Sequence, residues 1–141
     1  MINKYEIINK KINYFYNLIK KYNAGLILKG KEVKLIRNKK CNISNSYCKI
    51  YKNNIYIYNF KIHNLNLRKI KLLLLKKEIL KIYQYVYNKN RTIIPQKIYF
   101  SNSGFAKIII YICIRKKLYD LKKKNKKKEK EQNKKNLKLY Y

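Results

Sequence analysis

The fold is decided by residues 24–47, which read AGLILKGKEVKLIRNKKCNISNSY. An apolar, strand-like run ends at Gly30. A short basic segment follows, in which Val33 and Ile36 are spaced for the buried side of a helix. An Asn/Ser-rich turn then leads into a second strand-like run. The stretch therefore predicts a strand, a helix over residues 32–37 and another strand in close succession.

The residues before this stretch predict one long strand from Tyr14 to Leu28. Apolar and aromatic side chains recur there at alternate positions, as on one face of a strand. They are Tyr14, Tyr16, Leu18, Tyr22, Ala24, Leu26 and Leu28, and only Lys20 interrupts the alternation. Gly25 indicates a bulge or a bend, which a small curved sheet needs. Residues 1–13 predict a frayed arm or a short helix.

Residues 46–52 and 55–61 predict a hairpin, because the pair Asn53-Asn54 between them tolerates positive φ. Its exposed tyrosines have two interpretations. They are either platforms on which bases stack or ordinary strand surface and core.

A helix is predicted from the Arg68–Leu74 segment to about Tyr87. Its expected buried stripe is Leu72, Leu75, Ile79, Ile82 and Val86. A second hairpin follows, with strands at residues 91–100 and 105–114. Pro95 within the first of these strands requires an edge or a bulge. The second strand is apolar on both faces and is expected to be central.

Charge dominates the composition: among 141 residues, 37 are Lys or Arg and 6 are Asp or Glu, which gives a net charge of +31. A bias toward A/T-rich codons explains the abundance of Lys, Asn, Ile and Tyr but not the scarcity of acids. Such a charge repels itself unless a polyanion neutralises it. RNA or DNA is therefore the predicted partner, and an anionic membrane surface is the alternative.

No reactive cluster is visible in the sequence. Cys41, Cys48 and Cys113 are scattered, and His63 is the single histidine. A zinc site needs clustered ligands, and acid–base cleavage needs paired groups that converge. We therefore expect no metal, no cofactor and no enzymatic activity, with a nuclease as the enzyme alternative. An odd number of cysteines indicates a reducing cytoplasm, and the longest apolar run, near Ile108, is too short to span a bilayer.

The block at residues 24–47 resembles the small protein B family, the SsrA-binding proteins that partner transfer-messenger RNA. The ordered matches are Ala24-Gly25, Gly30, Glu32-Val33-Lys34, Arg37, Asn42 and Ser46-Tyr47. The resemblance covers about residues 9–122. It implies a mainly β fold with helices: a small antiparallel β-barrel, OB-like, with two or three peripheral helices. Residues 1–114 would form the RNA-binding domain, and residues 115–141 a disordered basic C-terminal tail that folds on the ribosome.

The resemblance implies that the barrel binds the tRNA-like domain of transfer-messenger RNA and delivers it to stalled ribosomes for rescue by trans-translation. The basic tail would enter the empty message channel beside the small-subunit decoding region. The implied partners are thus transfer-messenger RNA and the ribosome, and we expect a cytoplasmic monomer that binds no membrane. A ribosomal protein or a general RNA-binding β-barrel protein is the alternative.

Site residues carry over from the family position by position. RNA-contacting positions fall on Asn9, Asn23, Arg68, Lys71 and Leu73. Lys34 and Arg37 share a basic helical face that is either solvated or, as the resemblance favours, in contact with RNA phosphates. Ribosome-contacting positions fall on Tyr14, Lys116, Lys117, Asp120, Lys122 and Leu137.

This chain also departs from the family pattern. Asn23 stands where glutamate is usual, and Tyr14 where histidine is usual. At the start of the tail, Arg115 replaces a glycine and Leu121 replaces a lysine. Farther along, Lys130 stands in place of a tryptophan.

Overall fold

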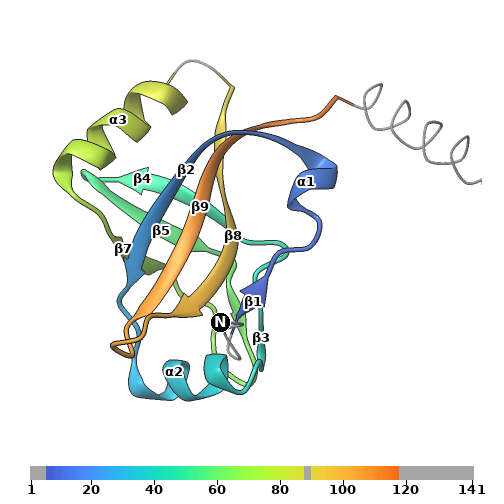
Figure 1. The fold of residues 1–141 in the computed structure, drawn as a ribbon, viewed down its shortest axis with the longest axis vertical. Coiled ribbons are helices and arrows are strands. Elements are labelled where there is room, and N and C mark those ends of the chain that lie inside the picture. Colours follow the sequence, from blue (N-terminus) through green and yellow to red (C-terminus); the bar gives the residue numbers. More distant parts are fainter. Residues whose placement is uncertain (1–5, 88–89, 118–141) are drawn as a thin grey trace, which may run out of the picture.

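The computed structural model describes residues 6–87 and 90–117. Its strands are β1 (Ile7–Ile8), β2 (Tyr16–Leu26), β3 (Cys41–Asn42), β4 (Tyr47–Tyr51), β5 (Asn54–Tyr58), β6 (Lys61–Ile62), β7 (Ile70–Leu73), β8 (Thr92–Phe100) and β9 (Ala106–Arg115). Its helices are α1 (Ile12–Phe15), α2 (Gly30–Arg37) and α3 (Lys76–Val86). The fold is mainly β with a few helices, as predicted (Figure 1).

Within the described ranges, six strands form a closed antiparallel ring. They follow the order β8, β4, β5, β7, β2 and β9, and β9 pairs back onto β8. β1 lies beside β8, and β3 and β6 form a separate two-stranded ribbon. The junction between β4 and β8 is narrow, because only Cys48 and Ile93 are paired there.

The hydrophobic core fills the ring. Ile55 and Ile57 of β5 are completely buried, and they pack in one cluster with the inward isoleucines of β9. Ile36 of α2 and Ile82 of α3 join the same cluster and are also completely buried. Figure 1 shows these two helices at opposite ends of the ring. Each helix therefore closes one end of the core.

β2 contributes to two different clusters because a bulge at Ile19 shifts its register against β9. Before the bulge, Leu18 pairs with Cys113 and packs in a small cluster under α1. After the bulge, Tyr22 faces the main core. The prediction of one continuous face was therefore wrong, since one extra residue exchanges the two sides of a strand.

The start of this strand and the place of its bulge also differ from the prediction. The strand begins at Tyr16, and Tyr14 belongs to α1. The register shift of this strand lies at Ile19, whereas a bulge or a bend was expected at Gly25. Within residues 1–13, the described part contains β1 and the first two residues of α1, so the short helix was only partly predicted.

The prediction of a helix from residue 68 onward was wrong in its first part. Ile70–Leu73 forms β7, which pairs with β5 and β2, and α3 begins only at Lys76. Leu72 is buried in the sheet rather than on the helix. Leu75, expected in the buried stripe, precedes α3 and is 69% exposed.

Both predicted hairpins are present. The turn of the first lies one residue earlier than expected: Lys52 and Asn53 have positive φ, and Tyr51 pairs with Asn54. In the second, the register shifts after Pro95, which confirms the expected bulge. β9 pairs on both sides, with β2 and β8, and is central as predicted. The disorder expected at residues 118–141 falls outside the described residues.

Candidate nucleic-acid interface

Gly25 lies at the centre of an outward surface formed by β7, β2 and β9. It pairs with Leu73 on one side and with Lys107 on the other. Leu72 and Ile108, the neighbours of these two residues, are buried in the core. Since successive side chains alternate across a sheet, Leu73 and Lys107 point outward. We call this surface the β2 face; it consists of Asn23, Gly25, Leu73, Tyr99 and Lys107.

The glycine at position 25 lets Leu73 lie close to β2. A Cβ atom at this position would stand 3.2 Å from the Leu73 Cβ, which is closer than ordinary contact. Leu73 is nevertheless 54% exposed. The β2 face therefore presents an exposed apolar side chain directly beside Gly25.

Asn23 and Tyr99 connect the β2 face to β8. The Asn23 Nδ2 donates a hydrogen bond to the Tyr99 hydroxyl oxygen at 2.6 Å. Tyr99 pairs with Lys107 in the register of β8 and β9, so the amide, the phenol and the ammonium group belong to one surface. Such a set supplies a phosphate contact and hydrogen-bonding groups for a sugar or a base edge.

Lys71 borders the β2 face on β7. It is half-buried and pairs with Tyr56 of β5, and its carbonyl oxygen accepts a hydrogen bond from the Ile27 N–H at 3.2 Å. Its direct neighbours in sequence, Ile70 and Leu72, are buried, so Lys71 points outward as Leu73 does. Of the predicted RNA-contacting residues, the structure thus brings Asn23, Lys71 and Leu73 together.

α2 carries a second basic surface. Lys34 and Arg37 are both exposed on this helix. The Arg37 guanidinium lies 4.9 Å from the centre of the Phe100 ring, which orients it by a cation–π contact. The predicted arrangement of these two residues on one exposed face agrees with the structure.

Arg68 is bound to a buried carboxylate. Its Nε donates to Glu32 Oε2 at 2.9 Å, and its second terminal nitrogen donates to Glu32 Oε1. Glu32 Oε1 also accepts the N–H of Lys29, which caps the start of α2. Burial alone would raise the pKa of Glu32, but the hydrogen bonds from Arg68 and Lys29 outweigh it and hold that pKa below its ordinary value. Arg68 therefore ties α2 to the segment before β7.

Asn9 has a different environment from the other predicted RNA-contacting residues. It is 3% exposed. Its Nδ2 donates to the Pro95 carbonyl oxygen at 3.2 Å, and its Oδ1 accepts from the Lys11 N–H at 3.3 Å. The side chain of Asn9 thus holds the segment after β1 against the bulge of β8.

The described residues of the predicted ribosome-contacting set lie together at the end of β9. Lys116 donates its N–H to the Phe15 carbonyl oxygen at 2.9 Å and its Nζ to the Asn13 carbonyl oxygen at 2.8 Å. Tyr14 contacts Phe15 edge to face, with 4.8 Å between ring centres. Lys117 follows Lys116 directly and is the last residue that the structure describes. Asp120, Lys122 and Leu137 fall outside the described residues.

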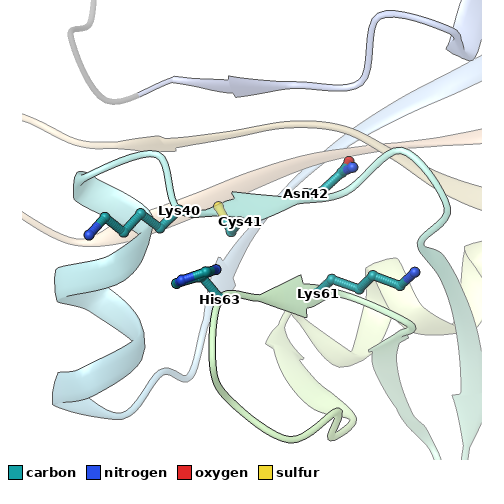
Figure 2. A pocket seen from close by; sticks show the side chains of 5 residues that line it. All are labelled: Lys40, Cys41, Asn42, Lys61 and His63. Atoms are coloured by element: carbon teal, nitrogen blue, oxygen red, sulfur yellow. The ribbon is translucent and has the colours of Figure 1, made fainter.

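His63 and Cys41 share an open pocket on the β3–β6 ribbon. Figure 2 shows it with Lys40, Asn42 and Lys61, and the two lysine side chains extend in opposite directions. Burial raises the pKa of the Cys41 thiol to about 11, so the thiol is protonated at neutral pH. In residues 6–87 and 90–117, no group of three or more His, Cys, Asp or Glu side chains is placed to hold a metal ion. The same part of the chain contains no helix long and apolar enough to cross a membrane.

Two residues of the β2 face, Tyr99 and Lys107, were not predicted. The available signal for Lys107 was that it interrupts the apolar run of residues 105–114. That signal gives the outward direction of the side chain but not its neighbours. Only the register of β9 against β2 and β8 places it beside Gly25 and Tyr99.

The fold and its surfaces define a class: small, mainly β proteins whose outer surface combines basic, aromatic and amide side chains suited to nucleic acid. Residues 6–139 match the family model of the SmpB protein. The chain is 36% identical over 122 residues to the SsrA-binding protein of Sulfurovum sp. (strain NBC37-1), covering 79% of this chain and 80% of that protein. It is 37% identical over 127 residues to the SsrA-binding protein of Mycoplasmopsis synoviae (strain 53), covering 86% of this chain and 88% of that protein. The chain therefore belongs to the SmpB family.

A solved structure with a similar fold also supports membership of the SmpB family. It is described as "tmRNA-SmpB: a journey to the center of the bacterial ribosome". The two chains superpose with a TM-score of 0.66 at 31% sequence identity, over 80% of this chain and 85% of that one. The family resemblance seen in residues 24–47 is thus confirmed over most of the chain.

Proposed function

We propose that this protein binds the tRNA-like domain of transfer-messenger RNA and delivers it to stalled ribosomes for rescue by trans-translation. Its relatives are SsrA-binding proteins, and its structural neighbour is a tmRNA–SmpB assembly of the bacterial ribosome. The observation that carries the proposal is the β2 face, where Leu73 and Lys107 flank Gly25 within a family that binds this RNA. The protein would act as a monomer in the cytoplasm, as a binding protein without a catalytic step.

The proposed RNA-binding unit is residues 1–114, with the ring of strands serving as a small OB-like barrel. Lys71 and Lys107 supply charges for phosphates, which contribute most of the affinity and depend on salt. Asn23 and Tyr99 offer hydrogen-bonding groups, and Leu73 offers an apolar contact to a sugar or a base. The sheet holds these groups in fixed positions, because each belongs to a strand paired on both sides.

The remaining predicted residues would contact RNA phosphates from α2, support the RNA-binding surface indirectly, or contact the ribosome. Lys34 and Arg37 lie exposed on α2, where they would add phosphate contacts. Arg68 and Asn9 would act indirectly, since each is hydrogen-bonded within the protein. Tyr14, Lys116 and Lys117 would face the ribosome, and residues 115–141, with Asp120, Lys122 and Leu137, would form the segment that enters the message channel.

The test compares a tRNA-like RNA with an RNA duplex of equal length. We expect wild-type protein to prefer the tRNA-like RNA at physiological salt, and the L73A/K107A variant to lose that preference. Each phosphate contact removed should lower the salt slope by about one unit. Lys61→Ala, which removes an exposed lysine from β6, is the matched control and should change neither quantity. Equal affinity of the wild-type protein for both RNAs would favour the general RNA-binding alternative.

A further inference from the structure

The hairpin of β4 and β5 carries an outward aromatic and basic surface that the proposed function does not use. Its tyrosines and Lys49 alternate along β4 and β5 with the core residues Cys48, Ile55 and Ile57, which are buried inside the ring. They therefore point away from the core. We call this surface the tyrosine face; it consists of Tyr47, Lys49, Tyr51, Lys52, Tyr56, Tyr58 and Lys69.

The rings of the tyrosine face form two neighbouring pairs. Tyr47 and Tyr58 are directly opposite in register and nearly parallel, with ring centres 5.6 Å apart and an angle of 12° between the planes. Tyr51 and Tyr56 lie at 6.5 Å and 60°. Tyr51 is 48% exposed, and the other three rings are half-buried. The strands thus fix four aromatic rings on one surface.

Lysine ammonium groups surround these rings. Lys69 Nζ lies 4.8 Å from the ring centres of both Tyr51 and Tyr56. Lys49 Nζ lies 5.5 Å from the Tyr47 ring, and Lys52 Nζ 5.4 Å from the Tyr51 ring. Residues 47–69 contain neither Asp nor Glu. The positive charge of this surface is therefore not neutralised by any acid of its own segment.

We propose that the tyrosine face binds a single-stranded RNA segment. Bases stack on aromatic side chains whatever their sequence, and phosphates are attracted to nearby cations. Tyr51 and Tyr56 supply the stacking surface. Lys69 moves from their ring faces to a phosphate when a base takes its place, and Lys49 and Lys52 bind the phosphates beside it. A positively charged surface of this kind favours a polyanion over a second copy of the chain, which carries the same net charge.

The tyrosine face adjoins the β2 face, because Tyr56 pairs with Lys71 of β7, but the two surfaces consist of different side chains. Leu73 and Lys107 lie on β7 and β9 on either side of β2, whereas the four rings lie on β4 and β5. The inference thus goes beyond the proposed function: binding of the tRNA-like domain and binding of a single strand would use different residues. Each binding activity can therefore be tested with variants that leave the residues of the other surface unchanged.

The test uses the full chain and two probes of about eight units. One is oligouridylate, and the other is an abasic ribose–phosphate oligomer of equal length and charge. Fluorescence anisotropy at about 0.3 M salt reduces the contribution of phosphate contacts that both probes share. We expect the wild-type protein to bind oligouridylate about tenfold more tightly than the abasic oligomer. A Y51L/Y56L variant should lose this difference, and a Y51F/Y56F variant should keep it.

The control is a tyrosine pair outside the tyrosine face. Tyr83 and Tyr87 on and just after α3 are also stacked, at 5.2 Å, and are 46% and 57% exposed. A Y83L/Y87L variant should keep the preference for oligouridylate. Equal affinity of the wild-type protein for the two probes, or an equal loss in both leucine variants, would overturn the inference.

A second measurement separates this inference from the proposed function. The Y51L/Y56L variant should bind the tRNA-like RNA as the wild-type protein does, and its melting temperature shows whether it folds. The L73A/K107A variant should lose the preference for tRNA-like RNA but keep that for oligouridylate over the abasic oligomer. If Y51L/Y56L folds but loses the tRNA-like RNA as well, the tyrosine face is part of that site, and the inference of a separate single-strand surface is wrong.

Discussion

Asn23 on β2 donates a hydrogen bond to the hydroxyl oxygen of Tyr99 on β8, although β9 lies between the two strands. The bond holds the Asn23 amide over the outer side of β9. The Asn23 Oδ1 can still accept a hydrogen bond from a partner, and the Tyr99 hydroxyl can still donate one. The side chains of Asn23 and Tyr99 thus form one hydrogen-bonded polar pair on the proposed RNA-binding surface.

Tyr99→Phe should weaken binding of the tRNA-like RNA by about three- to tenfold, because a hydrogen bond of this kind contributes about 1 kcal/mol. If Tyr99 acts by orienting Asn23, the double variant N23A/Y99F should bind no more weakly than Asn23→Ala alone. Titration of the three variants with labelled RNA measures this coupling. Fully additive losses would show that Tyr99 contacts RNA independently.

Gly25→Ala should destabilise the protein by about 1–3 kcal/mol, since the new Cβ would overpack against Leu73 of the paired strand. RNA binding should weaken too, because Leu73 must shift. Gly30→Ala is the matched control: nothing lies within 4 Å of its added Cβ, and it begins α2. That change should stabilise by about 0.4–1 kcal/mol. Urea unfolding measures both, and equal effects of the two substitutions would contradict the close approach at Gly25.

The Glu32–Arg68 pair should make the free energy of unfolding depend on pH in the acidic range. The folded-state pKa of Glu32 lies below its ordinary value of 4.5. The stabilisation is therefore complete above that value and is lost as the pH falls through the lowered pKa. Glu32→Gln should flatten the fall in unfolding free energy below about pH 4.5 and should cost about 1–3 kcal/mol at neutral pH.

Glu6→Gln is the control for this acid dependence. Glu6 pairs with Lys97 at 3.3 Å, but both side chains are near 30% exposed. A pair of this exposure contributes little to stability. Its removal should change the unfolding free energy by less than about 1 kcal/mol at any pH. An equal effect of Glu6→Gln and Glu32→Gln would contradict a special role for the buried pair.

Truncation after Lys117 should leave binding of free transfer-messenger RNA nearly unchanged, because the β2 face lies entirely within the described residues. The same truncation should abolish tagging of nascent chains on stalled ribosomes. Replacing only the lysines of residues 118–141 by glutamine should weaken tagging relative to the wild type more at low salt than at high salt, because salt screens the lysine contribution of the wild type. A truncated protein that supports tagging at the full-length rate would show that this segment has no role in rescue.

The sequence predicted those elements whose signals are local. α2 was placed to within two residues, because its apolar spacing and its flanking residues agree. The apolar run Leu72–Leu75 is compatible with both a strand and a helix. Its first two residues form a strand because β7 pairs with β2 and β5, which the local sequence does not indicate. The bulge at Ile19 has no local signal either, since its residue type suits an ordinary strand position.

The candidate site was less predictable, for a related reason. Arg68 was predicted to contact RNA from the family resemblance, which gives no sign of its partner within the protein, Glu32, 36 positions away. Asn9 similarly contacts Pro95, 86 positions away. Partners at such separations are determined by the closure of the ring and not by any spacing within a motif.

The hydrogen bonds of Lys116 to Asn13 and Phe15 fix where the described part of the chain ends: beside α1, and not on the β2 face. The two dozen residues that follow Lys117 in the sequence are rich in lysine. If those residues contact the ribosome as proposed, they would start from α1. The same helix that carries Tyr14 would then determine on which side of the docked protein the lysine-rich sequence begins.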